Sequence, residues 1–207
     1  MDYVRISASY LFNMKLDDNF LLIKSERRNQ YQPIGGCYKY FADAEEFLLS
    51  IGCIPEKKSN GVDSLMDLRL LIPSDKIDIF LEWFNSGIGR ETTFDREFDE
   101  ELVSLLSPEE QIVFDNIKTQ KLKNGSFDLF FDEEKKIYSI KPMDIISIEL
   151  NQEQKQILKN AAKTKNNLLL ASEEDILNGY KRLSDGSKLK IGSHTKNILP
   201  TKSKIFE

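Results

Sequence analysis

The chain has 207 residues, of which 40% are hydrophobic, enough for one large domain or for one domain with a substantial appendage. Its 29 Lys and Arg residues against 34 Asp and Glu residues give a net charge of −5, which argues against a protein that coats extended nucleic acid. No apolar run approaches the roughly 20 residues of a membrane-spanning helix, and the first residues lack a basic leader with a cleavage site, so we expect a cytoplasmic protein without a membrane span.

The first half of the chain alternates hydrophobic patterns of period 2 and period 3.6, which favours an α+β or α/β domain. Alternating apolar residues predict three strands, at 3–14, 19–24 and 65–72. Asp43 is expected to cap a helix over 44–51 that ends at Gly52. The polar segment 55–64 is expected to be flexible.

A second helix is predicted to open at Ser74 and to end at Gly87. Its apolar residues recur at helical spacing and share one face: Ile77, Phe80, Leu81 and Phe84. Trp83 projects away from that face. It would serve as a base-stacking platform, as an interface anchor for a homodimer, or as a core residue packed against a neighbouring element.

The second half of the chain carries stronger start signals for helices. Ser107 is followed by Pro and, three residues after it, by Glu, which predicts a capped helix to about Lys118. Asn151 and Ser172 are expected to cap two further helices. Strands are predicted at 126–131, 137–150 and 167–171. The basic tail from Tyr180 is expected to form a hairpin or an ordered loop.

The two cysteines, Cys37 and Cys53, form no CxxC pattern and have no neighbouring histidine. This spacing points to neither a disulfide framework nor a thiolate zinc site. We therefore expect two buried, reduced thiols.

The stretch 89–106 places six acidic residues on one predicted helix. Thr92 and Asp95 form a plausible capping box, which starts the helix near Thr93. A buried stripe is expected along Phe94, Phe98, Leu102 and Leu105 or Leu106. The acidic residues of the stretch are Glu91, Asp95, Glu97, Asp99, Glu100 and Glu101.

Three of these acids, Glu97, Glu100 and Glu101, stand at i, i+3 and i+4, so their carboxylates converge on one patch. Acids near a helix start often form an ordinary solvated face that interacts well with the helix dipole. Like charges at i, i+4 repel each other by roughly 0.2 to 0.5 kcal/mol, however. A hard cation such as Mg²⁺ or Mn²⁺ would turn that repulsion into binding. Both interpretations stay open at this point.

The segment REFDEEL, residues 96–102, resembles the core of the Nudix box. Residues 20–36, FLLIKSERRNQYQPIGG, resemble the strand and loop that lead into the paired glycines of that box. The resemblance implies an α+β fold with a mixed sheet between helices. It also implies Mg²⁺ (or Mn²⁺) on the box helix and a diphosphate-containing substrate that is hydrolysed by metal-activated water. The glycines that shape the loop beneath the substrate correspond to Gly35 and Gly36.

By the same resemblance, Glu97, Glu100 and Glu101 match the metal ligands and catalytic acids of the family. Arg96 matches the arginine that orients one of the acids through a salt bridge.

The sequence also departs from the ordinary box. A long insertion, about residues 37–90, separates the glycine pair from the box helix. Ile88 stands where the leading glutamate is expected, and Glu91 is the nearest alternative. Val103 replaces the glycine that follows the paired glutamates.

This insertion, together with residues 79–91 at its end and residues 192–199 later in the chain, resembles the SMODS-associated Nudix family. That family is encoded beside cyclic-oligonucleotide synthases in bacterial anti-phage (CBASS) systems. We therefore predict a Nudix-like domain over residues 1–179 and a basic C-terminal segment over residues 180–207. The resemblance implies antiviral defence in bacteria as the context.

Two functions follow from the resemblance. The first is a Mg²⁺-dependent hydrolase of a nucleoside diphosphate-linked or related nucleotide, acting as an effector in cyclic-oligonucleotide anti-phage signalling. The second is a catalytically degenerate domain that binds a cyclic oligonucleotide or another nucleotide as a sensor. In either case the partner is a small nucleotide.

Four further residues are candidates for phosphate contacts. Arg27 and Arg28 precede the glycine pair and suit bidentate contacts to phosphate, whereas the plain alternative, a solvated loop, is the favoured interpretation. His194 and Lys196 lie together in the basic tail. The lone histidine has a plain structural alternative in a turn.

Overall fold

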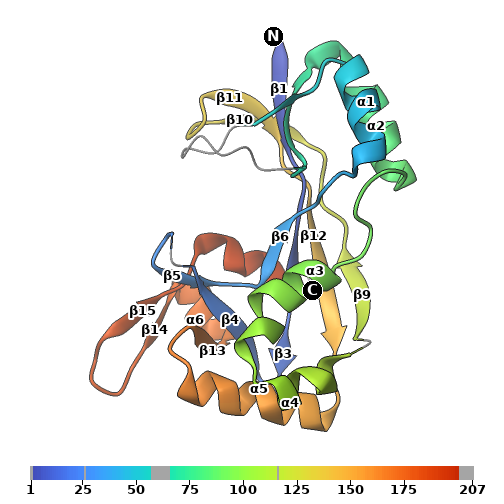
Figure 1. Cartoon of the computed structure of the whole chain (residues 1–207). Helices are drawn as coiled ribbons and strands as arrows, with labels where there is room; N and C mark the ends of the chain where they lie inside the picture. The colour runs from blue at the N-terminus through green and yellow to red at the C-terminus, as the bar shows by residue number, and fades with distance from the viewer. Residues whose placement is uncertain (1, 26, 57–65, 116, 201–207) are drawn as a thin grey trace, which may run out of the picture. The chain divides into compact units, whose positions relative to one another are not determined.

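The structure is a computed structural model that describes residues 2–25, 27–56, 66–115 and 117–200 (Figure 1). Most of the segment 55–64, predicted to be flexible, lies outside these ranges. The described residues form two compact units. The first comprises Met1–Tyr10, Gly36–Arg96 and Lys123–Asp144; the second comprises Leu11–Gly35, Glu97–Leu122 and Ile145–Glu207. The predicted insertion falls in the first unit, and the predicted boundary at residue 180 lies inside the second.

The first unit is built on a five-stranded sheet. Its central strand, β1 (Tyr3–Ser7), runs parallel to β11 (Ile137–Ile140) and antiparallel to β8 (Arg69–Pro73). The edge strands are β10 (Leu129–Asp132) and β7 (Ile54–Pro55). The alternation that predicted β1 and β8 places Val4, Ile6, Leu70 and Ile72 in the core.

Helices α1 (Ala42–Ser50) and α2 (Ile77–Ser86) of the same unit lie side by side (Figure 1). The ring of Trp83 packs against Phe47 and Phe80, with centroids 5.7 and 5.4 Å apart. Core packing is therefore the role that Trp83 has in this unit. Gly87 ends α2 in the left-handed conformation, φ 72°, as predicted.

The predicted cap of α1 is wrong. The helix begins at Ala42, its N-cap is Phe41 without a side-chain hydrogen bond, and Asp43 lies inside the first turn. An acidic residue at this position still interacts favourably with the helix dipole. Asp43 thus marks the helix start for an electrostatic reason and not as a hydrogen-bonding cap.

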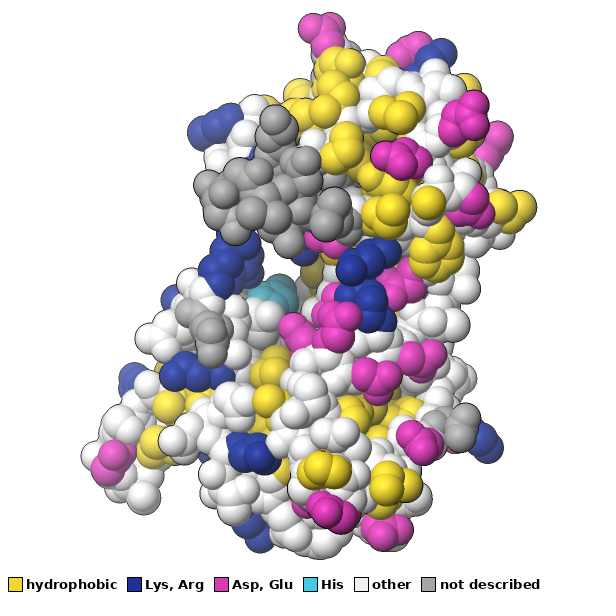
Figure 2. Space-filling model, in the orientation of Figure 1, with side chains coloured by type: hydrophobic (Ala, Val, Ile, Leu, Met, Phe, Trp, Pro, Cys, Tyr) yellow, Lys and Arg dark blue, Asp and Glu magenta, His cyan; other side chains and the backbone are white. Residues whose placement is uncertain are grey.

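Hydrophobic side chains gather on the surface over α1 and α2 in Figure 2. The large exposed apolar residues of this region are Phe41, Leu49, Ile79 and Ile88. Trp83 is half-buried, so these four more exposed side chains dominate the apolar surface over α1 and α2. The homodimer stays a prediction.

The second unit contains a sheet of order β13-β4-β3, with β5 paired to the end of β4. Its strands are β3 (Lys15–Leu16), β4 (Asn19–Ser25), β5 (Gln30–Gln32) and β13 (Leu168–Ser172). The basic tail forms the predicted hairpin from β14 (Tyr180–Arg182) and β15 (Lys188–Lys190), and η4 (Ser193–Ile198) follows it.

A further sheet has the order β6-β2-β12-β9. Some residues of its strands belong to the first unit and others to the second. They are β2 (Ser9–Asn13), β6 (Gly35–Cys37), β9 (Lys118–Lys123) and β12 (Met143–Glu149). Together with the helices, these sheets confirm the predicted α+β class.

Three helices begin at the predicted caps. Ser107, Asn151 and Ser172 each accept a hydrogen bond from the backbone three residues later, and each completes a capping box. The helices are α4 (Pro108–Gln111), α5 (Gln152–Thr164) and α6 (Glu173–Asn178). Local start signals were therefore sufficient to place these helix N-termini.

Two helices are shorter than predicted. The acidic helix, α3, spans Asp95–Glu101, so it begins after the predicted start near Thr93, and Asp95 is its first residue rather than the partner of Thr92 in a capping box. A 3-10 turn, η2 (Val103–Leu105), replaces its predicted last turn. Leu102 and Leu106 are buried on either side of this turn, and Ser107, the residue before Pro108, is extended. The helix predicted to reach Lys118 ends at Gln111, because η3 (Ile112–Phe114) turns the chain into β9.

Both cysteines are buried, as predicted. Burial raises the pKa of each thiol to about 12, which keeps it protonated and unreactive near neutral pH. No helix in the described ranges is long and apolar enough to cross a membrane.

The capping box of α6 gives a first prediction. The Ser172 hydroxyl accepts from the Asp175 N–H at 3.1 Å, and the Asp175 carboxylate accepts from the Ser172 N–H at 3.0 Å. Ser172→Ala should lower the free energy of unfolding by about 1 kcal/mol, measured by urea denaturation. Ser184→Ala, at an exposed position beyond β14, is the matched control and should leave stability unchanged. Equal unfolding midpoints for both variants would contradict the prediction.

Candidate functional site

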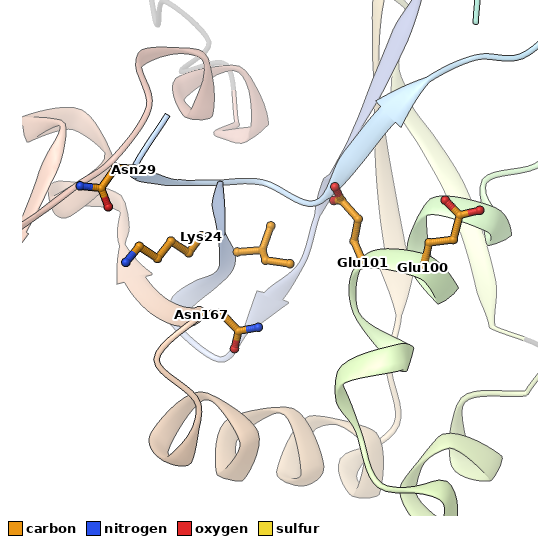
Figure 3. Close-up of a pocket in the computed structure, with 6 residues that line it drawn as sticks. Lys24, Asn29, Glu100, Glu101 and Asn167 are labelled. Carbon is orange, nitrogen blue, oxygen red and sulfur yellow. The ribbon is translucent and has the colours of Figure 1, made fainter. Parts of the chain in front are cut away.

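A cavity of about 510 Å³ lies in the second unit. Figure 3 shows Glu100 and Glu101 of α3 on one side of it and Lys24, Asn29 and Asn167 on the other. Lys24 comes from β4, Asn29 from the turn between β4 and β5, and Asn167 from the residue before β13. Ile23 of β4 completes the lining. The cavity thus has one acidic wall and one wall of amides and a lysine.

The acidic wall is set by the packing of α3. Phe98 is buried, and its ring meets Phe12 and Phe114 at centroid distances of 6.0 and 6.1 Å. Residues three positions apart lie on neighbouring parts of one helix face, whereas residues two positions apart lie on opposite sides, so burial of Phe98 places Glu101 beside the buried face and Glu100 away from it. Phe98 therefore fixes the direction in which Glu100 and Glu101 project.

Glu101 is held by Gly35, the first glycine of the predicted pair. The Gly35 N–H donates to Glu101 Oε2 at 3.2 Å, across 66 positions of sequence. A backbone donor orients the carboxylate and stabilises its charge. The box helix and the glycine loop, separated by the insertion, are thus in direct contact within the second unit.

The structure brings two of the three predicted metal ligands to the cavity. Glu100 and Glu101 line it, whereas Glu97, half-buried on the same helix, does not. Within the part of the chain that the structure describes, no three His, Cys, Asp or Glu side chains gather closely enough to hold a metal ion.

Arg96, in the first unit, forms a two-point ion pair with Glu91. Its Nε lies 3.0 Å from Glu91 Oε1, and its Nη2 lies 3.2 Å from Glu91 Oε2. Arg96 Nη2 also donates to the Cys37 carbonyl at 3.1 Å, and Glu91 Oε2 accepts from the Lys39 N–H at 3.3 Å. Arg96 therefore pairs with Glu91, the residue that the sequence offered as the alternative to the leading glutamate.

The chain matches the SMODS-associated NUDIX domain family over residues 3–199. It belongs to this family. Family membership supports a Nudix-type function, and Nudix domains bind small nucleotide molecules. Comparisons with curated proteins and with solved structures found no match.

The predicted phosphate-binding residues of this NUDIX domain lie outside the cavity lining. His194 is half-buried near Arg28; burial lowers the pKa of the imidazole, and the charge of Arg28 lowers it further. A Cβ on Gly192 would lie 2.5 Å from Gln30 Nε2 and 2.9 Å from His194 Cε1, so the residues after Arg28 pack against the tail. Arg27 and Lys196 are exposed.

Sequence reasoning missed the amide wall of the NUDIX domain. Asn29 lies beside the noted arginines, and Asn167 begins a predicted strand, but neither position carries a local signal. They meet because β13 pairs antiparallel with β4, with Leu168 opposite Ile23. Only that long-range register could have revealed Asn167.

Breaking the Glu91–Arg96 pair should destabilise the NUDIX domain. Glu91→Gln removes the charge that compensates Arg96, which retains 23% exposure of its side chain. We expect a loss of about 2 kcal/mol in the free energy of unfolding, below the roughly 3 to 5 kcal/mol of a fully buried pair. Glu82→Gln removes one negative charge at an exposed position of α2, so it is the control for the loss of charge without the loss of the ion pair. Equal urea midpoints for the two variants would show that the pair contributes nothing.

The environment of His194 predicts a pH dependence of stability. A lowered pKa in the folded state means that the unfolded chain binds a proton more readily, so folding loses stability as pH falls below the ordinary value of 6.5. His194→Asn removes this contribution. The free energy of unfolding of the parent should fall more than that of the variant between about pH 7.5 and about pH 5.5. A free energy of unfolding that falls equally with pH in the parent and in the variant would contradict a lowered pKa of His194.

Proposed function

We propose that the cavity is the active site of a metal-dependent Nudix-type hydrolase that cleaves the diphosphate of a nucleoside diphosphate-linked substrate. The observation that carries this proposal is the placement of Glu100 and Glu101 opposite Lys24 in one cavity. Its volume of about 510 Å³ lies within the roughly 300 to 1,000 Å³ of small-molecule sites.

The residues present fit a divalent cation that binds the protein through only two carboxylates. Mg²⁺ commonly binds through one or two carboxylates and completes its coordination with water and substrate phosphate oxygens. Glu100 and Glu101 would supply those two carboxylates, with Mn²⁺ as an alternative ion. When bound, the ion supplies charge that neutralises phosphate oxygens and lowers the pKa of an attacking water.

The protein's own groups have distinct proposed roles. The Gly35 N–H holds Glu101 Oε2, so that carboxylate meets the substrate in a fixed orientation. The Lys24 ammonium would bind a phosphate oxygen from the opposite wall. The general base that takes a proton from the attacking water is proposed to be Glu100 or Glu101, because Glu97, the other candidate, lies outside the cavity lining. The pairing of Arg96 with Glu91 fixes the first turn of α3, and Gly36 continues the glycine loop into β6.

A second candidate function is nucleotide sensing without hydrolysis. It is favoured by Ile88 at the position of the leading glutamate and by the separation of Glu97 from the cavity lining. A cyclic oligonucleotide would then be the ligand. Either function is compatible with an effector or sensor role in bacterial cyclic-oligonucleotide anti-phage signalling.

Hydrolysis is tested by incubating the purified protein with Mg²⁺ or Mn²⁺ and a panel of nucleoside diphosphate-linked compounds, with products separated by chromatography. Turnover should fall by more than about 100-fold in the double variant Glu100→Gln, Glu101→Gln, since even outer partners of a metal contribute roughly 10- to 100-fold. Glu109→Gln, exposed on α4, should retain full turnover.

Turnover that survives the double substitution would disprove the roles of Glu100 and Glu101. Metal-dependent binding of a cyclic oligonucleotide without product would support the sensor.

A further inference from the structure

The wall opposite the acids holds three polar side chains with unused hydrogen-bonding capacity. Across the described ranges, the side chains of Lys24, Asn29 and Asn167 form no hydrogen bond or ion pair with the protein, although all three line the cavity. Each carboxamide offers one acceptor oxygen and two N–H donors. The protein leaves these groups available to a ligand.

The backbone fixes where these amides stand. Asn167 accepts a hydrogen bond at its carbonyl from the Lys24 N–H at 2.8 Å, and the neighbouring Asn166 carbonyl accepts from the Tyr31 hydroxyl at 2.6 Å. Asn29 occupies a left-handed turn position, φ 45°, which asparagine tolerates better than most residues. The amide wall is therefore placed by β4, β5 and β13 before any ligand binds.

Amides and phosphates are poorly matched in one respect. A phosphate presents only acceptors near neutral pH, so it can use Lys24 and the amide N–H groups but is repelled by the amide oxygens. A nucleobase presents donors beside acceptors, and asparagine pairs with adenine through two hydrogen bonds, to N6 and N7. The half-buried aliphatic side chain of Ile23 adds an apolar contact for a base.

We propose that Asn167, assisted by Asn29, recognises the nucleobase of the substrate, while Lys24 and the acidic wall recognise its phosphates. This inference rests on the proposed function and restricts the class of substrate. The substrate is a nucleotide whose base enters the cavity, and not a compound recognised through its phosphates alone.

The test compares ADP, which has a base, with inorganic pyrophosphate, which has none. Binding is measured by titration calorimetry on the full chain with Ca²⁺ in place of Mg²⁺, to limit turnover. Asn167→Ala should weaken ADP binding by roughly 5- to 150-fold, the range of one bidentate amide–base pair. Its affinity for pyrophosphate should be unchanged. Lys24→Gln should weaken both ligands by the same factor.

Asn166→Ala is the matched control, since it removes the same side chain one position outside the cavity lining and should change neither affinity. Circular dichroism of each variant confirms that the fold is retained. An unchanged affinity of Asn167→Ala for ADP, or an equal loss for ADP and pyrophosphate, would overturn the base-recognition role and leave the hydrolase intact. A parent protein that binds neither ligand in the presence of the metal would overturn both proposals.

Discussion

The hydrogen bond from the Gly35 N–H to Glu101 is the contact on which the candidate site depends. It joins the glycine loop to the box helix although the insertion separates them in sequence. A folded domain tolerates long insertions in its connections, because the entropic cost of closing a loop grows only slowly with its length. The spacing of the ordinary Nudix box is lost in the sequence, but its two halves are still in contact.

The ion pair at the start of α3 also differs from the ordinary Nudix box. Arg96 finds a buried carboxylate at Glu91, five positions earlier, while the position of the ordinary leading glutamate is the exposed Ile88. The backbone carbonyl of Cys37 and the N–H of Lys39 complete the hydrogen bonds of this ion pair. A buried pair is tolerated better when its remaining donors and acceptors have partners, and these two backbone groups supply such partners.

The two walls of the cavity differ in charge and in hydrogen-bonding groups. One wall carries the two carboxylates of Glu100 and Glu101, whereas the opposite wall offers a lysine and two amides. A ligand that carries a cation and phosphates at one end and a neutral polar group at the other would satisfy both walls. A metal-bound nucleotide has that distribution of charge.

The sequence by itself determined the features whose physical cause lies within one turn or one motif. These are the caps at Ser107, Asn151 and Ser172, the α+β class, and the box segment 96–102 that indicated the family. Tertiary structure decided the rest: the early ends of α3 and α4, the partner of Arg96, and the meeting of Asn167 with the box helix at one cavity. Those outcomes depend on strand register and on the burial of residues far apart in sequence, and local propensity carries no information about either.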